Sequence, residues 1–307
     1  MKILVSDKFR DEGIDIFQEN GFEVVKNFTI TPEDLKQEIE NYDAIVIRSR
    51  TKLTADILEN AKNLKVIGRA GVGLDNVDLE KAEQRNIKVF NTPEAPSVSV
   101  AELALGLMLG FARHITKADK TMHAGEWRKN EYMGYVLKGK KVGLIGFGNI
   151  GQAVAKRCAA LEMDVGVFDV IPELLEKAKT LGYTVYPSIE ELVIKAQIIS
   201  LHIPANEHTK NMINQQRLNL MNEKTVIINT ARGTLIDEEA LIQSLKNGEI
   251  GGAALDVFRE EPLKNEDLYS IHDKLILTPH IGSSTVETQV SAAVGVAEKI
   301  TQFLKEL

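Results

Sequence analysis

Residues 141–151 read KVGLIGFGNIG, an apolar run that leads directly into a G-x-G-x-x-G turn. The run Lys141–Gly146 is typical of a buried strand, and apolar side chains then recur at helical spacing. Each glycine has its own physical reason: Gly146 permits the tight bend, Gly148 lets a pyrophosphate approach the backbone, and Gly151 lets helix pack on strand. The start of the helix would offer free N–H groups and a partial positive charge to phosphates. The segment predicts a dinucleotide-binding βαβ unit.

A carboxylate stands where such a unit would use one. The next expected strand, Asp164–Phe168, ends at Asp169, which lies 18 residues beyond Gly151. A carboxylate there can accept hydrogen bonds from the adenosine ribose hydroxyls, and it would repel a 2′-phosphate. Val170 and Ile171 bring no positive charge to offset that repulsion. We therefore expect the segment to bind a dinucleotide, against the alternative of a purely structural glycine turn. Of the two cofactors, we expect NAD rather than NADP.

Short β-rich runs alternate with helical stretches on both sides of this motif, which predicts an α/β protein with two doubly wound parallel-sheet domains. The sequence NTPEAP at 91–96, with its two prolines, marks the expected boundary between them. The helix Pro32–Glu40 should have Thr31 as its N-cap, and the last helix spans about 285–307. The expected strands are Lys2–Val5, Phe22–Val25, Ala44–Ile47, Lys65–Ile67, Lys88–Phe90, Lys141–Gly146, Asp164–Phe168, Gln197–His202, Thr225–Asn229, Gly252–Phe258 and Leu275–Leu277.

One helix, expected over Val98–Lys120, is apolar on nearly every side in its first half. A single sheet face cannot cover such a helix, and Gly106 and Gly110 would let another helix approach closely. The apolar stretch Val98–Phe111 carries Glu102 and is shorter than the ~20 residues that a membrane span needs. We expect a buried helix at a domain or subunit contact.

The composition excludes several classes of protein. With 37 basic and 44 acidic residues the net charge is −7, which disfavours binding to nucleic acid by bulk charge. Cys158 is the single cysteine, so no internal disulfide can form, and no Cys/His cluster has zinc spacing. No metal is expected. The N-terminus shows no secretory signal, and we expect a soluble, cytoplasmic protein.

Three polar residues follow expected strands of the second half, where doubly wound sheets place their sites. They are Arg232, Glu261 and His280. Oxidation of an alcohol by NAD needs a base for the hydroxyl proton, a cation for a substrate anion and a group that tunes the base. Histidine, arginine and glutamate supply those roles. Taken singly, each could equally be a solvated surface charge, an acidic turn or a structural histidine.

The chain resembles the NAD-dependent D-2-hydroxyacid dehydrogenases over essentially its whole length, and most closely the members that act on D-3-phosphoglycerate. The segments that carry the resemblance are IRS at 47–49, VIGRAGVGLDNVD at 66–78, SVAEL at 99–103, GEW at 125–127, YMG at 132–134, GK at 139–140, NTARG at 229–233, GAALDVF at 252–258 and PHIG at 279–282. The resemblance implies a Rossmann cofactor domain at 95–283. It also implies a flavodoxin-like substrate domain at 1–94, completed by 284–307 across the cleft.

The resemblance also implies roles for individual residues. His280 would exchange the proton, Glu261 would pair with it, and Arg232 would bind the substrate carboxylate and C2 oxygen. Asp256 would hold the nicotinamide carboxamide. The other implied cofactor contacts are Gly146, Gly148, Asn149, Ile150, Gly151, Asp169, Ile203, Thr230, Ala231, Ser283 and Val72. The implied substrate contacts are Arg48, Ser49, Arg69, Gly71, Val72, Gly73, Arg232 and His280.

The same resemblance implies a substrate and a partner. Oxidation of D-3-phosphoglycerate to 3-phosphohydroxypyruvate, the first step of serine synthesis, would need extra cations for the phosphate, for which Arg50 and Lys129 are further candidates. Both could equally be solvated charges, and Lys129 could also reach in from a partner subunit. The 97–120 helix region would form a homodimer contact. Because the last residue is Leu307, we expect no additional regulatory domain and no serine feedback through one.

Two alternatives remain. Glyoxylate and hydroxypyruvate reductases share this scaffold and differ in taking plain 2-hydroxyacids or 2-keto acids. An NAD-responsive binding scaffold belongs to another class of protein, and turnover of NADH with hydroxypyruvate or its phosphate would separate it from an enzyme.

Overall fold

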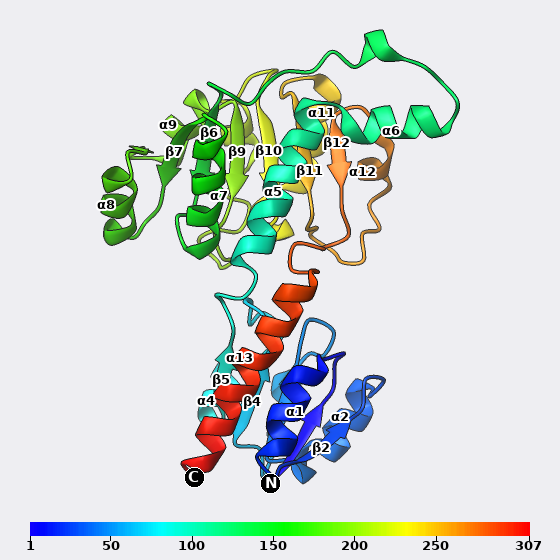
Figure 1. Ribbon diagram of the computed structural model, residues 1–307, viewed down its shortest axis with the longest axis vertical. Helices are drawn as coiled ribbons and strands as arrows, with labels where there is room; N and C mark the ends of the chain where they lie inside the picture. Colours follow the sequence, from blue (N-terminus) through cyan, green and yellow to red (C-terminus); the bar gives the residue numbers. More distant parts are fainter. The chain divides into compact units, whose positions relative to one another are not determined.

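The computed structural model describes residues 1–307 and divides the chain into two compact units. The first unit comprises Met1–Pro96 and Ser283–Leu307, and the second comprises Ser97–Gly282. The domain boundaries expected from the sequence lay at 94/95 and 283/284. Each unit has its own parallel sheet with helices on both faces (Figure 1).

The sheet of the first unit has five parallel strands in the order β2-β1-β3-β4-β5. This is the flavodoxin-like order, in which successive strands are added first on one side of β1 and then, from β3 on, on the other. The strands are β1 (Lys2–Val5), β2 (Glu23–Lys26), β3 (Ala44–Ile47), β4 (Val66–Arg69) and β5 (Lys88–Asn91). The helices are α1 (Asp11–Glu19), α2 (Pro32–Glu38), α3 (Ala55–Glu59), α4 (Leu79–Gln84) and α13 (Val286–Lys305), with a 3-10 turn at Ile39–Asn41.

Alternation along the strands builds two cores on this sheet. Ile3 and Val5 point to the face covered by α1 and α13, whereas Leu4 points to the face covered by α2, α3 and α4. Burial of both faces explains why β3 reads AIVI, with no polar residue. Thr31 caps α2 as expected, because its hydroxyl accepts from the Asp34 N–H at 3.1 Å. Helix α13 packs along α1 and over β4 and β5 of the same unit.

The sheet of the second unit has seven parallel strands in the order β12-β11-β10-β9-β6-β7-β8. The order reverses between β6 and β9, which is the Rossmann arrangement extended by one strand. The strands are β6 (Lys141–Ile145), β7 (Asp164–Phe168), β8 (Thr184–Val185), β9 (Ile198–Leu201), β10 (Val226–Asn229), β11 (Gly252–Leu255) and β12 (Leu275–Leu277). The expectation of two doubly wound parallel sheets is confirmed.

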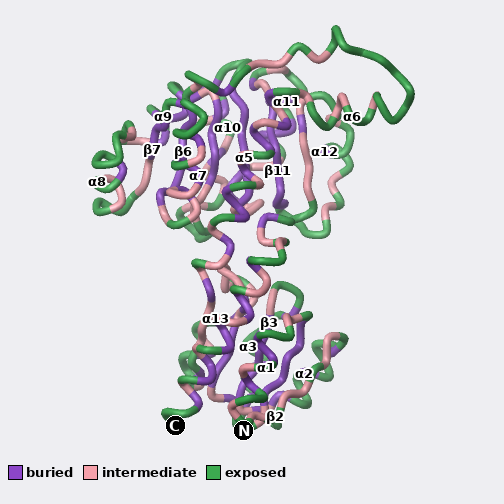
Figure 2. Tube along the Cα trace, in the orientation of Figure 1, coloured by how far each residue is buried: buried purple, intermediate pink, exposed green.

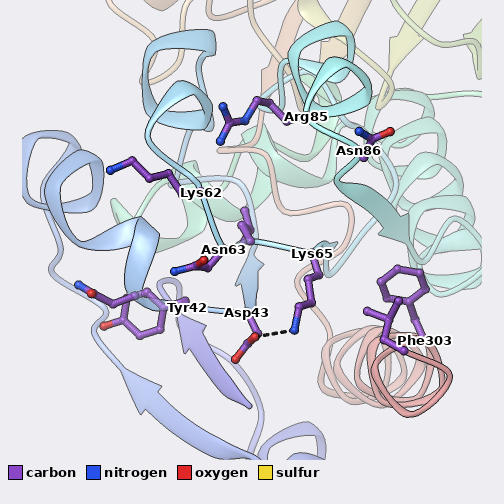
Figure 3. Close-up of a pocket in the computed structure, with 11 residues that line it drawn as sticks. Tyr42, Asp43, Lys62, Asn63, Lys65, Arg85, Asn86 and Phe303 are labelled. Atoms are coloured by element: carbon purple, nitrogen blue, oxygen red, sulfur yellow. Dashed lines mark hydrogen bonds and ion pairs between the residues drawn. The ribbon is translucent and has the colours of Figure 1, made fainter.

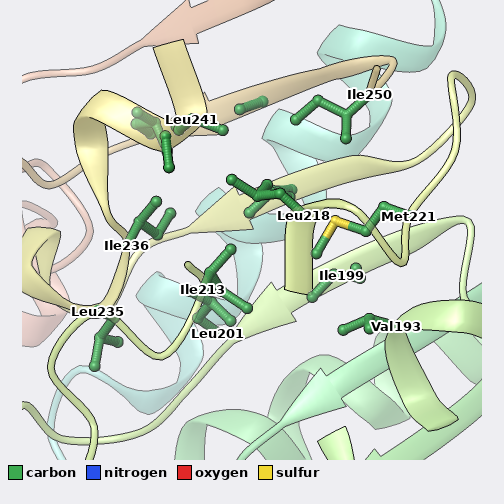
Figure 4. Packing of buried hydrophobic residues seen from close by; sticks show 14 of the residues in the cluster. Val193, Ile199, Leu201, Ile213, Leu218, Met221, Leu235, Ile236, Leu241 and Ile250 are labelled. Carbon is green, nitrogen blue, oxygen red and sulfur yellow. The ribbon is translucent and has the colours of Figure 1, made fainter. Parts of the chain in front are cut away.

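Helices cover both faces of this sheet, and its central strands β9, β10 and β11 are buried along their length (Figure 2). One face packs against α5 (Ser97–Ala112), α7 (Asn149–Ala160) and α8 (Pro172–Thr180). The other packs against α9 (Ile189–Lys195), α10 (Gln215–Leu218), α11 (Glu238–Asn247) and α12 (Glu266–Ser270). Figure 4 shows part of this second core, with Leu201 of β9 beside Ile213. Two 3-10 turns, Lys129–Glu131 and Gly233–Leu235, complete the unit.

The prediction of a single apolar helix over 98–120 is wrong, because two helices occupy this stretch. Helix α5 ends at Ala112, and α6 (Ile115–His123) starts after His114, whose φ of +55° lies in the left-handed region. The axes of α5 and α6 are bent by 66° relative to each other. No single helix of the chain is long and apolar enough to cross a membrane; the bent pair of α5 and α6 reaches that length and composition only when the two helices are taken together. Gly106 has no protein atom within 4 Å of where a Cβ would stand, and only Ile276 lies near Gly110, so neither glycine seats another helix within the chain.

Candidate active site

The turn that connects β6 to α7 is in contact with residues 202 and 203, which follow the carboxyl end of β9. Gly146 has a φ of +101°, and a Cβ on it would stand 2.4 Å from the carbonyl oxygen of His202 and 2.7 Å from Ile203 Cγ2. A larger residue therefore cannot occupy this position without moving the backbone. The expected cofactor contact Ile203 thereby lies directly against the turn.

Asp169 follows β7 and reaches back to the same turn. Its Oδ2 accepts from the Phe147 N–H at 2.6 Å, and its Oδ1 accepts from the Ile171 N–H at 3.0 Å. The carboxylate is thus fixed beside the glycine turn, and each oxygen keeps a lone pair for a ribose hydroxyl. One function of Asp169, the support of the turn, was not visible in the sequence.

The residues at this edge of the sheet fit a nicotinamide dinucleotide. Gly148 is the N-cap of α7, and a Cβ on it would meet no protein atom within 4 Å, which leaves the helix N-terminus open to a phosphate. Farther along the edge, Thr230 Oγ1 is buried and has no hydrogen-bond partner. A buried hydroxyl without a partner is costly in a folded protein, and a bound polar group would relieve that cost.

His280, which follows β12, and Glu261, which follows β11, form a hydrogen-bonded pair. His280 Nδ1 lies 2.6 Å from Glu261 Oε2, and the other carboxylate oxygen accepts from the Phe258 N–H at 3.0 Å. Burial alone would raise the pKa of the Glu261 carboxyl. The hydrogen bonds from His280 and Phe258, together with the charges of His280 and Arg232, instead hold that pKa below its usual value. An ionised carboxylate can only accept, so Nδ1 carries the proton and Nε2 is left as the basic nitrogen of the neutral ring.

The loop that carries His280 is held by Asp256, which is completely buried after β11. Its Oδ1 accepts from the Ile281 N–H at 2.9 Å and from the Thr278 hydroxyl, and its Oδ2 accepts from the Gly282 N–H at 2.8 Å. This support allows His280 to keep a φ of +52°, a conformation that residues other than glycine rarely adopt. The implied contact of Asp256 with a carboxamide stays a prediction.

Arg232 lies in the loop after β10, which is packed tightly against the loop after β11. A Cβ on Gly233 would stand 1.9 Å from the backbone carbon of Phe258, so only glycine permits this approach. Asn229 holds the loop by donating to the Arg232 carbonyl at 2.9 Å and by accepting from the Ala231 N–H at 3.0 Å. The packing brings Arg232 and Glu261 close enough for their charges to interact.

The expected substrate residues lie at the carboxyl edge of the sheet of the first unit. Arg69 is the last residue of β4 and pairs with Ile47, the last residue of the neighbouring strand β3. Arg48 and Ser49 come directly after Ile47. The 71–73 segment is tied to the 91–92 segment: the Gly71 N–H donates to Thr92 Oγ1 at 2.9 Å, and Asn91 Nδ2 donates to the Val72 carbonyl at 2.6 Å.

The structure therefore groups the predicted residues into two sets. The second unit holds those of the glycine turn, Asp169, Ile203, Thr230, Ala231, Arg232, Asp256, Glu261 and His280. The first unit holds Arg48, Ser49, Arg69, Gly71, Val72, Gly73 and Ser283. Apart from Ser283, which precedes α13, the residues of each unit lie at or beyond the carboxyl ends of its parallel strands, where ligands of doubly wound sheets bind.

A cavity of about 490 Å³ lies elsewhere, at the amino ends of β3, β4 and β5 (Figure 3). Its basic residues already have acidic partners: Lys65 Nζ lies 2.9 Å from Asp43, and Lys62 Nζ lies 2.8 Å from Glu40. This edge is opposite to the one that carries Arg48 and Arg69, so the cavity is not part of the candidate site.

Sequence reasoning missed the residues that support the site. Asp7 and Asn76 hold the segment that carries Arg48, and Asn91 and Thr92 hold the 71–73 segment. Their partners lie tens of residues away, so no local pattern signals them. Asp7, which lies two residues beyond β1, is the one whose position after a strand could have drawn attention.

The known proteins that resemble this chain include dehydrogenases and reductases of one family. Residues 105–282 match the model of the NAD-binding domain of D-isomer specific 2-hydroxyacid dehydrogenases. A D-3-phosphoglycerate dehydrogenase of Methanocaldococcus jannaschii is 45% identical over 99% of this chain, which spans 58% of that enzyme's length. A hydroxypyruvate reductase of Thermotoga maritima is 42% identical over 99% of the chain and 98% of its own length. The crystal structure of a glyoxylate reductase from Paecilomyes thermophila superimposes with a TM-score of 0.90 at 26% identity, covering 100% of this chain and 96% of that one.

Proposed function

The chain belongs to the D-isomer specific 2-hydroxyacid dehydrogenases, and from that premise we propose that it oxidises D-3-phosphoglycerate to 3-phosphohydroxypyruvate with NAD, reversibly. The reaction would be the first step of serine synthesis. The observation that carries the proposal is the pair of His280 and Glu261, 2.6 Å apart, on a loop held by buried Asp256.

Each residue of the pair has a defined task in the proposed reaction. His280 takes the proton of the C2 hydroxyl on Nε2, because Nδ1 is already bound to Glu261. Glu261 stays ionised at neutral pH and stabilises the imidazolium that forms. Arg232 binds the substrate carboxylate and stabilises the developing carbonyl oxygen. When bound, NAD supplies the acceptor for the hydride that leaves C2.

The first unit supports a phosphorylated substrate. A phosphate group adds about two negative charges, which a binding site must balance. Arg48 and Arg69 stand at the carboxyl ends of the neighbouring strands β3 and β4, so two guanidinium groups belong to this edge. Arginine suits phosphate because its planar donors bind two oxygens at once.

A second candidate function is reduction of hydroxypyruvate or glyoxylate. The Thermotoga maritima relative favours it, because the match extends over 98% of that protein. The two candidates share the proton relay and differ in the charge of the substrate. A substrate panel distinguishes them: D-3-phosphoglycerate and D-glycerate with NAD, then 3-phosphohydroxypyruvate, hydroxypyruvate and glyoxylate with NADH. We expect the highest kcat/KM with the phosphorylated pair, and a preference for the plain acids would establish the reductase instead.

We further propose that the protein acts in the cytoplasm as a homodimer formed through the 97–120 helix region. Helix α5 is apolar apart from Glu102 and two serines, its exposed positions Val98, Glu102 and Gly106 share one face, and Gly106 faces open space. The following segment exposes Trp127 by 78% and Met133 by 88%. Large exposed apolar side chains mark surfaces that bind protein partners. Light scattering on the purified protein at micromolar concentration should give twice the 34.0 kDa chain mass, whereas a monomer would contradict the proposal.

A further inference from the structure

The loop that carries the proposed phosphate ligand Arg48 is held by two side chains to which neither the motifs nor the family resemblance assigned a role. We call residues 48–51, Arg48-Ser49-Arg50-Thr51, the 48–51 loop; it follows β3 at the carboxyl edge of the first sheet. It has no regular secondary structure of its own. Its conformation therefore depends on the groups that bind its backbone.

Asp7 binds the loop from the side of β1. Its side chain is only 5% exposed, and both oxygens are used. Oδ2 accepts from the backbone N–H groups of Arg48 at 2.6 Å and Thr51 at 3.2 Å. Oδ1 accepts from the Thr51 hydroxyl at 2.8 Å and from Arg50 Nε at 3.0 Å. One buried carboxylate thus fixes both ends of the loop.

Asn76 binds the same two residues from the side of β4. Its Nδ2 donates to the Arg48 carbonyl at 2.7 Å and to the Thr51 carbonyl at 2.6 Å. Asp7 therefore accepts hydrogen bonds from the N–H groups of residues 48 and 51, and Asn76 donates hydrogen bonds to their carbonyl groups. The backbone polar groups at both ends of the loop are satisfied by side chains rather than by secondary structure.

Arg50 neutralises the buried carboxylate, although its own side chain is 49% exposed. Besides Asp7, its guanidinium donates to the Ile30 carbonyl at 3.2 Å and to the Ser6 carbonyl. A buried charge needs such a partner, because an unpaired one would be strongly destabilising. The sequence left Arg50 as a candidate for phosphate binding or a solvated charge; the structure adds a third role, the ion pair with Asp7.

We propose that Asp7 and Asn76 are positioning residues that set the affinity for the anionic substrate by holding Arg48 in place. The proposal rests on the proposed function in one respect, the role of Arg48 as a substrate ligand. With the loop already ordered, binding does not have to immobilise it, so more of the interaction energy appears as affinity. Neither residue touches the substrate, and both act through Arg48.

The test uses Asp7→Asn, which keeps the size of the side chain but removes its charge and places an amide N–H₂ group against one set of donors. We expect KM for the hydroxyacid substrate to rise about tenfold, while kcat and the Kd for NADH change less than twofold. Asp11→Asn is the matched control, because Asp11 makes an exposed 3.1 Å ion pair with Lys26 in the same unit. The control should leave all three constants unchanged.

A double-mutant cycle with Arg48→Ala shows whether the effect passes through Arg48. In the Arg48→Ala background, Asp7→Asn should raise KM less than twofold further, because the group that it positions is gone. Equal increases in both backgrounds would overturn the proposal, and so would an unchanged KM in Asp7→Asn alone. A merely structural role would instead lower the melting temperature and kcat with no selective change in KM.

Two further measurements keep the result decisive. If Asp7→Asn fails to fold, Asn76→Asp replaces it in the same cycle, since it has the same shape but cannot donate to the two carbonyls. If the wild-type protein turns over only plain 2-hydroxyacids, the phosphorylated substrate is contradicted, and the cycle is measured with those acids. A KM that Arg48→Ala does not change would refute the positioning role whatever the substrate.

Discussion

Replacement of Gly148 by alanine should separate cofactor binding from folding. Gly148 is the N-cap of α7, with φ −67° and ψ −164°, so its backbone is in the extended region that alanine also adopts. The added Cβ would meet no protein atom within 4 Å. Glycine is a somewhat better N-cap than alanine, which costs about 0.5–1 kcal/mol, and the lower entropy of the unfolded alanine chain offsets about 0.4–1 kcal/mol. The free energy of unfolding should therefore change by less than about 1 kcal/mol.

Cofactor affinity should respond quite differently. The middle glycine of the turn is the one that lets a pyrophosphate approach the backbone, and a methyl group there occupies that approach. A displaced pyrophosphate would lose one hydrogen bond or more to the N–H groups of α7, each worth about 1.5–3 kcal/mol because the acceptor is charged. At 1.4 kcal/mol per factor of ten, the Kd for NADH should rise by about tenfold to a hundredfold.

Two assays check this prediction. Fluorescence titration gives the Kd for NADH, and thermal melting without cofactor gives the stability. Gly146→Ala is the contrasting variant: its Cβ would stand 2.4 Å from the His202 carbonyl oxygen at a φ of +101°, so it should lower the melting temperature markedly. An unchanged Kd in a well-folded Gly148→Ala protein would refute the placement of the pyrophosphate at this turn.

The remaining predictions concern the proton relay, the cofactor preference and the buried thiol. His280→Ala should reduce kcat by about 10²–10⁴-fold with an unchanged Kd for NADH, and near-normal turnover would exclude it as the base. Glu261→Gln should move the acidic limb of the kcat/KM profile to lower pH, because the anion that stabilises the imidazolium is gone; an unmoved limb would argue against the pair. The pKa of Glu261 is lowered in the folded protein, so its contribution to stability is complete above the usual glutamate pKa and is lost as pH falls through the lowered value. Melting temperatures below about pH 4.5 should accordingly fall less steeply in Glu261→Gln than in the wild type. Asp169→Asn, which keeps an oxygen for the Phe147 N–H, should raise the ratio of NADP to NAD affinity, and a constant ratio would count against the ribose contact. Burial raises the pKa of the Cys158 thiol to about 12, so a thiol reagent should react with it only after denaturant is added.

Local patterns predicted the elements whose causes are local. Both faces of each sheet are buried, so strands such as Ala44–Ile47 and Asp164–Phe168 appear as short apolar runs bounded by polar residues, and their expected limits agree with the structure. The expected strand Gly252–Phe258 ends at Leu255 in the structure, because Val257 and Phe258 are buried in a loop that is itself packed. The expected strand Gln197–His202 is reduced to Ile198–Leu201. The break at His114 was missed because apolar residues continue on both sides of it and no proline or glycine marks it.

By itself, the sequence determined the α/β class, the glycine turn with its acidic residue after the next strand, and the set of residues that carry the proposed chemistry. These features are local or follow from the rule that parallel strands place their carboxyl ends at one edge. Only the tertiary structure decided how that chemistry is supported: the use of Asp256 to hold the His280 loop, the packing of Gly233 against Phe258, and the hold of Asp7 and Asn76 on the 48–51 loop. Each of these contacts joins loops that follow different strands. Their partners are chosen by the packing of the sheet, which no pattern within one segment can express.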